Sequence, residues 1–345
     1  MRLQSLLLMA VLGLLAGCPG EPAVEGFGGP TMGSTYSIKY QPGRGTPPTA
    51  ELRFDVQALF AELDSQISTY RPDSDLARFN ALPAGSCQAL PTIALELLAA
   101  SAELAAESGG ALDPTLEPLL RLWGFAGEPS GALPTAEQIE QARADTGLDK
   151  LELRDGQVCK KAALSLNFNS IAAGYAVDRV SELLLDKGVE NFLVEITGEL
   201  RARGHKPDGS PWRIAIEAPR EDQRQAQRVL ALDGLAVSTS GDYRQYFEQN
   251  GRRYSHTLDP RSGAPVEHNL AAVTVVDPSA LRADGLSTVL MVLGPERGLA
   301  FAEEQGIAAL FVSRAGEAFD VRPSTAFGKR FGEAAGPEAG EEIQP

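Results

Sequence analysis

Histidine and cysteine are scarce in this chain, which has three of each among 345 residues. No two cysteines are spaced as a CxxC pair or as zinc ligands, so neither a zinc site nor a dithiol site is expected. The chain also lacks a GxGxxG motif after a strand and a GxxxxGK[ST] motif. These absences argue against a Rossmann dinucleotide site and against a P-loop nucleotide site.

Positive charge is also in short supply. The chain has 31 Lys and Arg residues against 46 Asp and Glu residues, a formal net charge of −15. Such an acidic chain is not expected to take nucleic acid or an anionic lipid surface as its main partner. An acidic protein that handles a phosphate group needs a local cation, which favours a bound metal ion.

No apolar run near the N-terminus is long enough to span a bilayer comfortably. The run over residues 6–15 follows Arg2 and leads into the sequence LAGC, which ends at Cys18. Small residues before a lone cysteine are typical of a bacterial lipoprotein signal peptide. We expect residues 1–17 to be removed and Cys18 to carry lipid, anchoring the protein to a membrane on its periplasmic side. The alternative is a plain secretory signal with an incidental cysteine.

An oxidising compartment leaves two outcomes for the remaining cysteines, Cys87 and Cys159: a structural disulfide or two unpaired thiols. Residues 18–30, rich in Gly, Pro and Glu, are predicted to be a flexible tether. The acidic residues 332–345 are predicted to be a disordered tail. The domain proper is therefore expected over residues 31–331.

Helical and alternating apolar patterns are interspersed along this domain. Helical spacing predicts helices over residues 52–67, 93–107, 134–146, 171–185 and 280–293, and alternation predicts strands over residues 34–40, 192–196, 212–217 and 270–276, with a further helix and strand within 296–312. The irregular order indicates the α+β class, a mixture of α and β elements in a single large domain with mixed sheets and packed helices.

Two segments carry the strongest chemical signals. Residues 254–263 (YSHTLDPRSG) place His256 near Asp259 and Arg261, which offers a base, a carboxylate that could orient it, and a fixed cation. Asp284 and Thr288 are four residues apart, so both oxygens would lie on one helix face and could bind Mg²⁺. The alternative is that Asp284 caps a helix and Thr288 is solvated.

Two other segments leave their roles open. Residues 238–242 (STSGD) form a hydroxyl-rich turn that could donate to an anion or simply connect two strands. Residues 169–178 begin a helix with small side chains. These could expose the helix N-terminus to an anion, or they could let two helices pack closely.

Taken together, these segments resemble the ApbE-type flavin transferases, the FAD:protein FMN transferases. The resemblance covers about residues 31–312 and rests on ten segments in the same order: 31–36 (TMGSTY), 68–70 (STY), 110–114 (GALDP), 122–125 (LWGF), 170–172 (SIA), 174–178 (GYAVD), 194–200 (VEITGEL), 239–243 (TSGDY), 256–263 (HTLDPRSG) and 283–285 (ADG). Lipoprotein export also fits that family.

The resemblance implies a role for each matching residue. Asp284, Thr288 and the backbone carbonyl of Ser170 would bind Mg²⁺, and His256 would be catalytic. The residues implied in binding FAD are Met32, Tyr70, Ala111, Leu112, Asp113, Asn167, Ala173, Ser240, Leu258 and Arg261. The family commonly has Asp where this chain has Asn167, and often has a charged residue where it has Ala173.

The implied reaction moves FMN from FAD to a Ser or Thr hydroxyl of a partner protein and releases AMP. The expected partner is a subunit of an exported or membrane redox complex. Two alternatives stay open at this point. With water as acceptor, the same site would be an FAD pyrophosphatase, and without catalysis the chain would be a flavin-binding lipoprotein.

Overall fold

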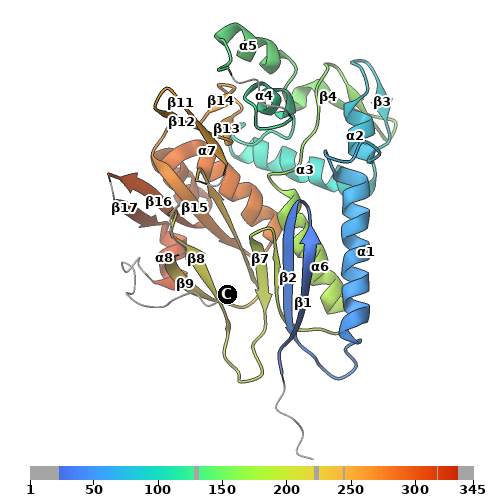
Figure 1. Cartoon of the computed structure of the whole chain (residues 1–345), viewed down its shortest axis with the longest axis vertical. Helices are drawn as coiled ribbons and strands as arrows, with labels where there is room; N and C mark the ends of the chain where they lie inside the picture. Colours follow the sequence, from blue (N-terminus) through green and yellow to red (C-terminus); the bar gives the residue numbers. More distant parts are fainter. Residues whose placement is uncertain (1–22, 128–131, 221–224, 244, 317, 333–345) are drawn as a thin grey trace, which may run out of the picture.

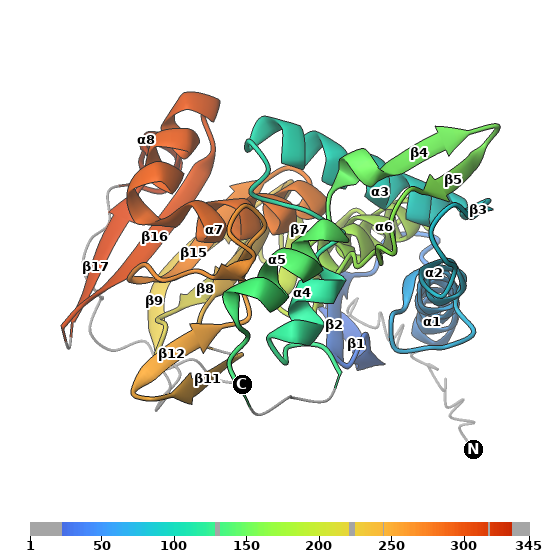
Figure 2. The ribbon, with the colours of Figure 1, turned by 90° about the horizontal axis from the view of Figure 1, so that it is seen from above.

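The computed structural model describes residues 23–127, 132–220, 225–243, 245–316 and 318–332 (Figures 1 and 2). The predicted signal peptide, Cys18 and all of the predicted acidic tail except Gly332 lie outside these residues. Within the described ranges, no helix is both long enough and apolar enough to cross a membrane.

The centre of the molecule is an eight-stranded sheet in which every strand runs antiparallel to its neighbours. The α+β class is confirmed, but the main sheet is antiparallel throughout and not mixed as expected. Its strands, in spatial order, are β1 (Glu25–Thr31), β2 (Ser34–Gln41), β6 (Asn191–Ile196), β7 (Glu199–Arg203), β10 (Leu235–Gly241), β15 (Leu270–Asp277), β16 (Ala308–Ala315) and β17 (Ala318–Pro323).

The predicted helices form within a few residues of their expected bounds. Most have an amphipathic pattern that the core buries, while α5, which has no buried residue, begins with a capping box of Thr135 and Gln138. The helices are α1 (Thr49–Ile67), α2 (Asp75–Asn80), α3 (Thr92–Glu107), α4 (Glu117–Leu122), α5 (Ala136–Ala144), α6 (Ala172–Asp186), α7 (Ala280–Gln305) and α8 (Thr325–Phe331), with a 3₁₀ turn at Leu148–Lys150.

Helix α7 contains the two helices that the sequence predicts, because its backbone breaks at Gly294 (φ 78°, ψ −179°). Pro295 follows and has no N–H to give to the Met291 carbonyl one turn earlier. His268 supplies the missing donor, with Nε2 at 2.7 Å from the Met291 oxygen. This histidine therefore supports the corner of α7.

The predicted tether over residues 18–30 is wrong for residues 25–30, which belong to strand β1 and pair with β2. The glycines that suggest a linker are needed by the strand itself. A Cβ at Gly28 would lie 2.6 Å from the Tyr36 carbonyl oxygen. Phe27 packs edge-on against the rings of Tyr36 and Tyr40. Glycine content alone does not distinguish a flexible linker from a closely packed strand.

The two faces of the sheet are covered differently (Figure 1). Helices α1, α6 and α7 pack on one face, while α8 and the ribbon of β8 (Trp212–Glu217) and β9 (Ala226–Leu232) cover the other. Strand β10 shows the alternation that this requires. Leu235 and Val237 face the ribbon, whereas Ser238 and Ser240 reach Ser287 of α7.

A separate layer lies over one end of the sheet, in the upper part of Figure 1. This cap consists of α4, α5 and the short strands β11 (Tyr246–Gln249), β12 (Arg252–Ser255), β13 (Leu258–Asp259) and β14 (Ala264–Pro265). Its small core contains Leu119, Trp123 and Leu258. The Trp123 indole donates to the Gly263 carbonyl at 2.8 Å, which joins the end of α4 to the turn between β13 and β14.

Cys87 and Cys159 form a disulfide bond, which resolves the open alternative. They face each other in a small sheet of β3 (Cys87–Gln88), β4 (Leu151–Arg154) and β5 (Gln157–Lys160). Next to the disulfide, the buried Lys160 ammonium donates to the Phe79, Asn80 and Leu82 carbonyls at the end of α2. Its charge is thus balanced by helix-terminal oxygens.

Helices α6 and α7 approach each other closely at Gly174. A Cβ there would lie 2.3 Å from the Ala280 carbonyl oxygen and 2.7 Å from the Asp284 Cβ. One turn later, Asp178 accepts hydrogen bonds from the Ala280 and Leu281 N–H groups at 3.0 Å, which caps the start of α7. Of the two roles open for residues 169–178, close helix packing is the one that this contact shows.

We expect Gly174→Ala to lower the free energy of unfolding by about 2 kcal/mol or more, because the added methyl group has no space between the helices. Urea denaturation followed by circular dichroism measures this change. The matched control is Gly328→Ala in α8, where an added Cβ meets nothing within 4 Å. That control should be neutral or stabilising by up to about 1 kcal/mol. Equal stability of the two variants would contradict the close-packing argument.

Candidate active site

A pocket of about 630 Å³ opens between α1 and the start of α6. Three of the residues expected to bind FAD, Met32, Tyr70 and Ala173, line it together. Met32 lies in the two-residue turn between β1 and β2, and Tyr70 lies in the loop after α1. Ala173 is in the first turn of α6. Residues from distant parts of the chain therefore meet at one opening of suitable size for part of a dinucleotide.

Asp284 lies in the first turns of α7, as predicted, and is almost completely buried. Its Oδ2 accepts the Gly174 N–H at 2.9 Å. Burial raises the pKa of Asp284 well above its ordinary value, and the negative charge of the nearby Glu199 raises it further. A buried carboxylate beside a second carboxylate is an environment that a cation would stabilise.

The hydroxyl groups around Asp284 form a short chain. Ser240 Oγ lies 2.8 Å from Ser287 Oγ, which donates to the Asp284 carbonyl oxygen at 2.9 Å. The predicted FAD contact Ser240 is thus already bonded to α7. Thr288 is half-buried, and its hydroxyl makes no hydrogen bond within the described part of the chain. It therefore remains available as a ligand.

The donor set fits Mg²⁺, which usually takes few protein ligands and completes its shell with water and phosphate oxygens. Asp284 offers a buried carboxylate, Thr288 an unengaged hydroxyl, and Ser170 a backbone carbonyl just before α6. In the described ranges no cluster of three or more His, Cys, Asp or Glu residues could hold a metal. A transition-metal centre is therefore a poorer match there than a sparse oxygen site.

His256 lies in the cap, in the segment between β12 and β13, and its ring forms a T-shaped pair with Phe125 at 6.4 Å between ring centres. Its Nδ1 is 3.0 Å from the Gln245 carbonyl oxygen. Because a carbonyl only accepts, Nδ1 carries the hydrogen of the neutral ring and Nε2 keeps its lone pair. Burial lowers the pKa of His256 below its ordinary 6.5. The neutral ring is a base near pH 7.

The sequence pattern suggested that Asp259 could orient His256, but in the structure it does not. Both of its carboxylate oxygens bind Arg261, with Oδ1 2.7 Å from Nε and Oδ2 2.7 Å from Nη2. The Arg261 N–H also donates to Oδ1 at 2.9 Å. Residues two apart in a tight turn satisfy each other, so the orienting partner of His256 is instead the Gln245 backbone.

Four residues expected to bind FAD are not among the residues that line this pocket in the described part of the chain. They are Ala111, Leu112 and Asp113 in the loop before α4, and Asn167 in the segment before α6. Ala111 and Leu112 are buried, and Asp113 accepts from the Thr115 hydroxyl at 2.6 Å. Asn167 donates its side-chain amide to the buried Glu117 at 2.8 Å. An aspartate at this position would instead place a second carboxylate against Glu117. The Asn167 amide thus suits its partner in this chain.

Leu258, predicted to line the FAD pocket, has its side chain inside the cap core. Only its backbone is then available to a ligand. Glu199 was matched within a segment but given no role by the sequence pattern, and the structure brings its charge near Asp284. Asp178 and Ser287 were likewise missed. Ser287 follows the predicted ligand Asp284 by three positions in α7, whereas Asp178 lies in the matched segment 174–178 and no helical spacing from a predicted site residue marks it.

Comparison with known proteins establishes the family of this chain. The model of the ApbE family matches residues 32–311. The chain belongs to the ApbE family. This ApbE family enzyme is 42% identical over 324 residues to the FAD:protein FMN transferase of Vibrio cholerae, covering 93% of this chain and 97% of that protein. It is 38% identical to the FAD:protein FMN transferase of Haemophilus influenzae, covering 91% and 94%.

Solved structures agree. The apo form of the Pseudomonas stutzeri flavinyl transferase ApbE matches with a TM-score of 0.85 and 59% sequence identity, over 91% of this chain and 98% of that one. The flavin transferase ApbE of Vibrio cholerae matches with a TM-score of 0.83 and 40% identity, over 90% and 100%. The ApbE family enzyme described here therefore shares both sequence and fold with named flavin transferases.

We expect Mg²⁺ to raise the melting temperature of the wild-type enzyme, and Asp284→Asn to abolish the rise, because the amide cannot replace the buried carboxylate as a ligand. At a concentration about 100 times the Kd, binding would stabilise the fold by roughly 2.7 kcal/mol. Differential scanning calorimetry with and without Mg²⁺ measures it. Asp277→Asn, a control at the end of β15, should keep the rise. A full rise in Asp284→Asn would remove Asp284 from the metal site.

Proposed function

We propose that this enzyme transfers FMN from FAD to a Ser or Thr hydroxyl of a partner protein in an Mg²⁺-dependent reaction that releases AMP. The observation that carries the proposal is the position of the buried Asp284. Its carboxylate meets the Gly174 N–H in the first turn of α6, and the same turn contributes Ala173 to the pocket. A dinucleotide in the pocket would thus have its diphosphate close to a cation site.

The chain's own residues have separable roles in this proposal. Asp284, Thr288 and the Ser170 carbonyl would hold Mg²⁺, which when bound supplies positive charge against the diphosphate. The pocket between α1 and α6 would orient FAD. His256 Nε2, with its lone pair free, would accept the proton of the acceptor hydroxyl.

The proposed reaction is a substitution at phosphorus, in which one P–O bond forms and another breaks. The acceptor oxygen forms a bond to the FMN-side phosphorus, and the bond from that phosphorus to the AMP oxygen breaks. The hydroxyl proton goes to His256, and AMP leaves with the electron pair of the broken bond. The product is FMN held by a phosphodiester, so no oxidant or reductant is needed.

The direct test mixes purified enzyme, FAD, Mg²⁺ and a candidate acceptor protein, and measures the acceptor mass together with free FMN and AMP. We expect the acceptor to gain the mass of FMN less water, with one AMP per transfer. Free FMN and AMP without a mass gain would instead identify an FAD pyrophosphatase. Bound FAD with neither product would identify a flavin-binding lipoprotein.

The same assay tests His256 through pH. Because its pKa is lowered below 6.5, His256 is neutral at pH 7, and kcat/KM should hold near neutrality and fall only as the pH drops below 6.5. His256→Gln should lower the rate by about 100-fold or more and remove that acidic limb. Transfer by this variant at the wild-type rate would contradict the role of His256 as base.

The location of the enzyme is a further part of the proposal. The disulfide between Cys87 and Cys159 supports an oxidising compartment. The sequence ending at Cys18 supports a lipid anchor on the periplasmic side of a membrane. The acceptor would then be a subunit of an exported or membrane redox complex.

We expect the exported enzyme to incorporate a radiolabelled fatty acid through Cys18, and Cys18→Ala to abolish the incorporation. Fractionation of the expressing cells supplies the second readout, because the variant should leave the membrane fraction. Cys87→Ala and Cys159→Ala together serve as the control and should keep the label. A labelled Cys18→Ala protein would overturn the anchor.

A further inference from the structure

Tyr70 is the most exposed of the large hydrophobic side chains in the described part of the chain. Its side chain is 87% exposed, although it belongs to the pocket lining. Packing against the described residues therefore does little to determine where the ring points. The position of the ring depends on the backbone of the Tyr70 loop (residues 68–74), which joins α1 to α2.

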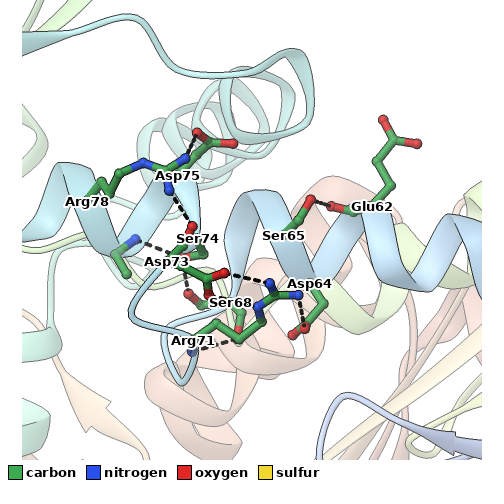
Figure 3. A network of polar contacts seen from close by, with 10 residues as sticks. Glu62, Asp64, Ser65, Ser68, Arg71, Asp73, Ser74, Asp75 and Arg78 are labelled. Atoms are coloured by element: carbon green, nitrogen blue, oxygen red, sulfur yellow. Dashed lines mark hydrogen bonds and ion pairs between the residues drawn. The ribbon is translucent and has the colours of Figure 1, made fainter.

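Two serines close this loop from inside (Figure 3). Ser74 is fully buried, donates to the Ser68 carbonyl at 2.6 Å and caps α2 by accepting the Ala77 N–H at 2.9 Å. Ser68 Oγ accepts the Tyr70 and Arg71 N–H groups, both at 3.3 Å. These longer bonds hold the exposed half of the loop only weakly.

Arg71 supplies a stronger restraint on the exposed side. Its Nε and Nη2 donate to the two carboxylate oxygens of Asp73 at 3.1 and 2.9 Å, and its Nη1 donates to Asp64 of α1 at 3.2 Å. Figure 3 shows the guanidinium between the two carboxylates. It joins the loop to the helix and separates two negative charges that would otherwise repel each other.

The same contacts argue against a direct role for Arg71 in binding phosphate groups. Its single positive charge is already balanced by the carboxylates of Asp64 and Asp73, so it is a poor ligand for the diphosphate of FAD. Its ion pairs are also exposed, and such pairs contribute little to global stability. What remains is its effect on the shape of the loop.

We propose that Arg71 is a positioning residue that holds the Tyr70 loop in the conformation that receives a flat ring of FAD. The inference rests on the proposed function. Neither His256 nor Asp284 is in this loop, so Arg71 would act on FAD affinity and leave the chemical step unchanged.

The test compares Arg71→Gln with the wild type in FAD binding, followed by flavin fluorescence, and in transfer kinetics. If the freed loop is competent for about a tenth of the time, the Kd and KM for FAD rise roughly tenfold. We expect kcat and the melting temperature to stay near their wild-type values. Arg71→Lys should be intermediate, because one ammonium group cannot bridge both carboxylates in the same geometry.

A double variant and a control complete the design. Arg71→Gln with Asp73→Asn removes the repulsion between the carboxylates and should recover part of the affinity. Arg154→Gln breaks an exposed ion pair with Glu152 on β4, outside the pocket lining, and should bind FAD like the wild type.

The outcomes separate this inference from the proposed function. Unchanged FAD affinity in Arg71→Gln, with a wild type that binds FAD, overturns the inference alone. A fall in kcat together with the melting temperature also overturns it, because the role would then be structural. A wild type that does not bind FAD overturns the proposed function and the inference with it.

Discussion

The contact between α6 and α7 is the constraint on which the site depends. Gly174 has no Cβ, so the backbone of α6 comes close enough for its N–H to reach the Asp284 carboxylate. Asp178, one turn further on, caps the start of α7 and also pairs with Arg201 of β7 at 2.8 Å. One short stretch of α6 therefore places the pocket lining, the buried carboxylate and the sheet relative to one another.

The parts of the proposed site are held in place by different kinds of contact. Asp284 belongs to the main core, where dense packing keeps its carboxylate in place despite the cost of burying it. His256 belongs to the cap, where its ring lies near Phe125, a residue packed against the small core of Leu119, Trp123 and Leu258. The exposed half of the Tyr70 loop is held by hydrogen bonds and ion pairs. The groups proposed for the chemical step are thus held by packing, while the Tyr70 loop at the pocket is held by exposed polar contacts.

Elements with a strong local pattern were predictable. Helix α3 follows the predicted 93–107 within one residue, because its apolar spacing and the glycines after it are local signals. Contacts between distant residues were not. The composition of residues 25–30 resembles a linker, yet strand pairing with β2 uses those glycines. Asp259 lies three residues after His256 but binds Arg261, since a turn brings nearer neighbours together first.

By itself, the sequence determined the α+β class, most helix and strand positions, the family and the identity of the chemical groups, because these depend on local periodicity and on motifs in a given order. Only the tertiary structure decided that Cys87 meets Cys159, that Gln245 sets the tautomer of His256 and that Glu199 lies near Asp284. The contacts of Cys87 with Cys159 and of Glu199 with Asp284 join segments distant in the chain, so packing of the whole core determines them. Gln245 and His256 are close in the chain, but their contact depends on the register of the β11–β12 hairpin.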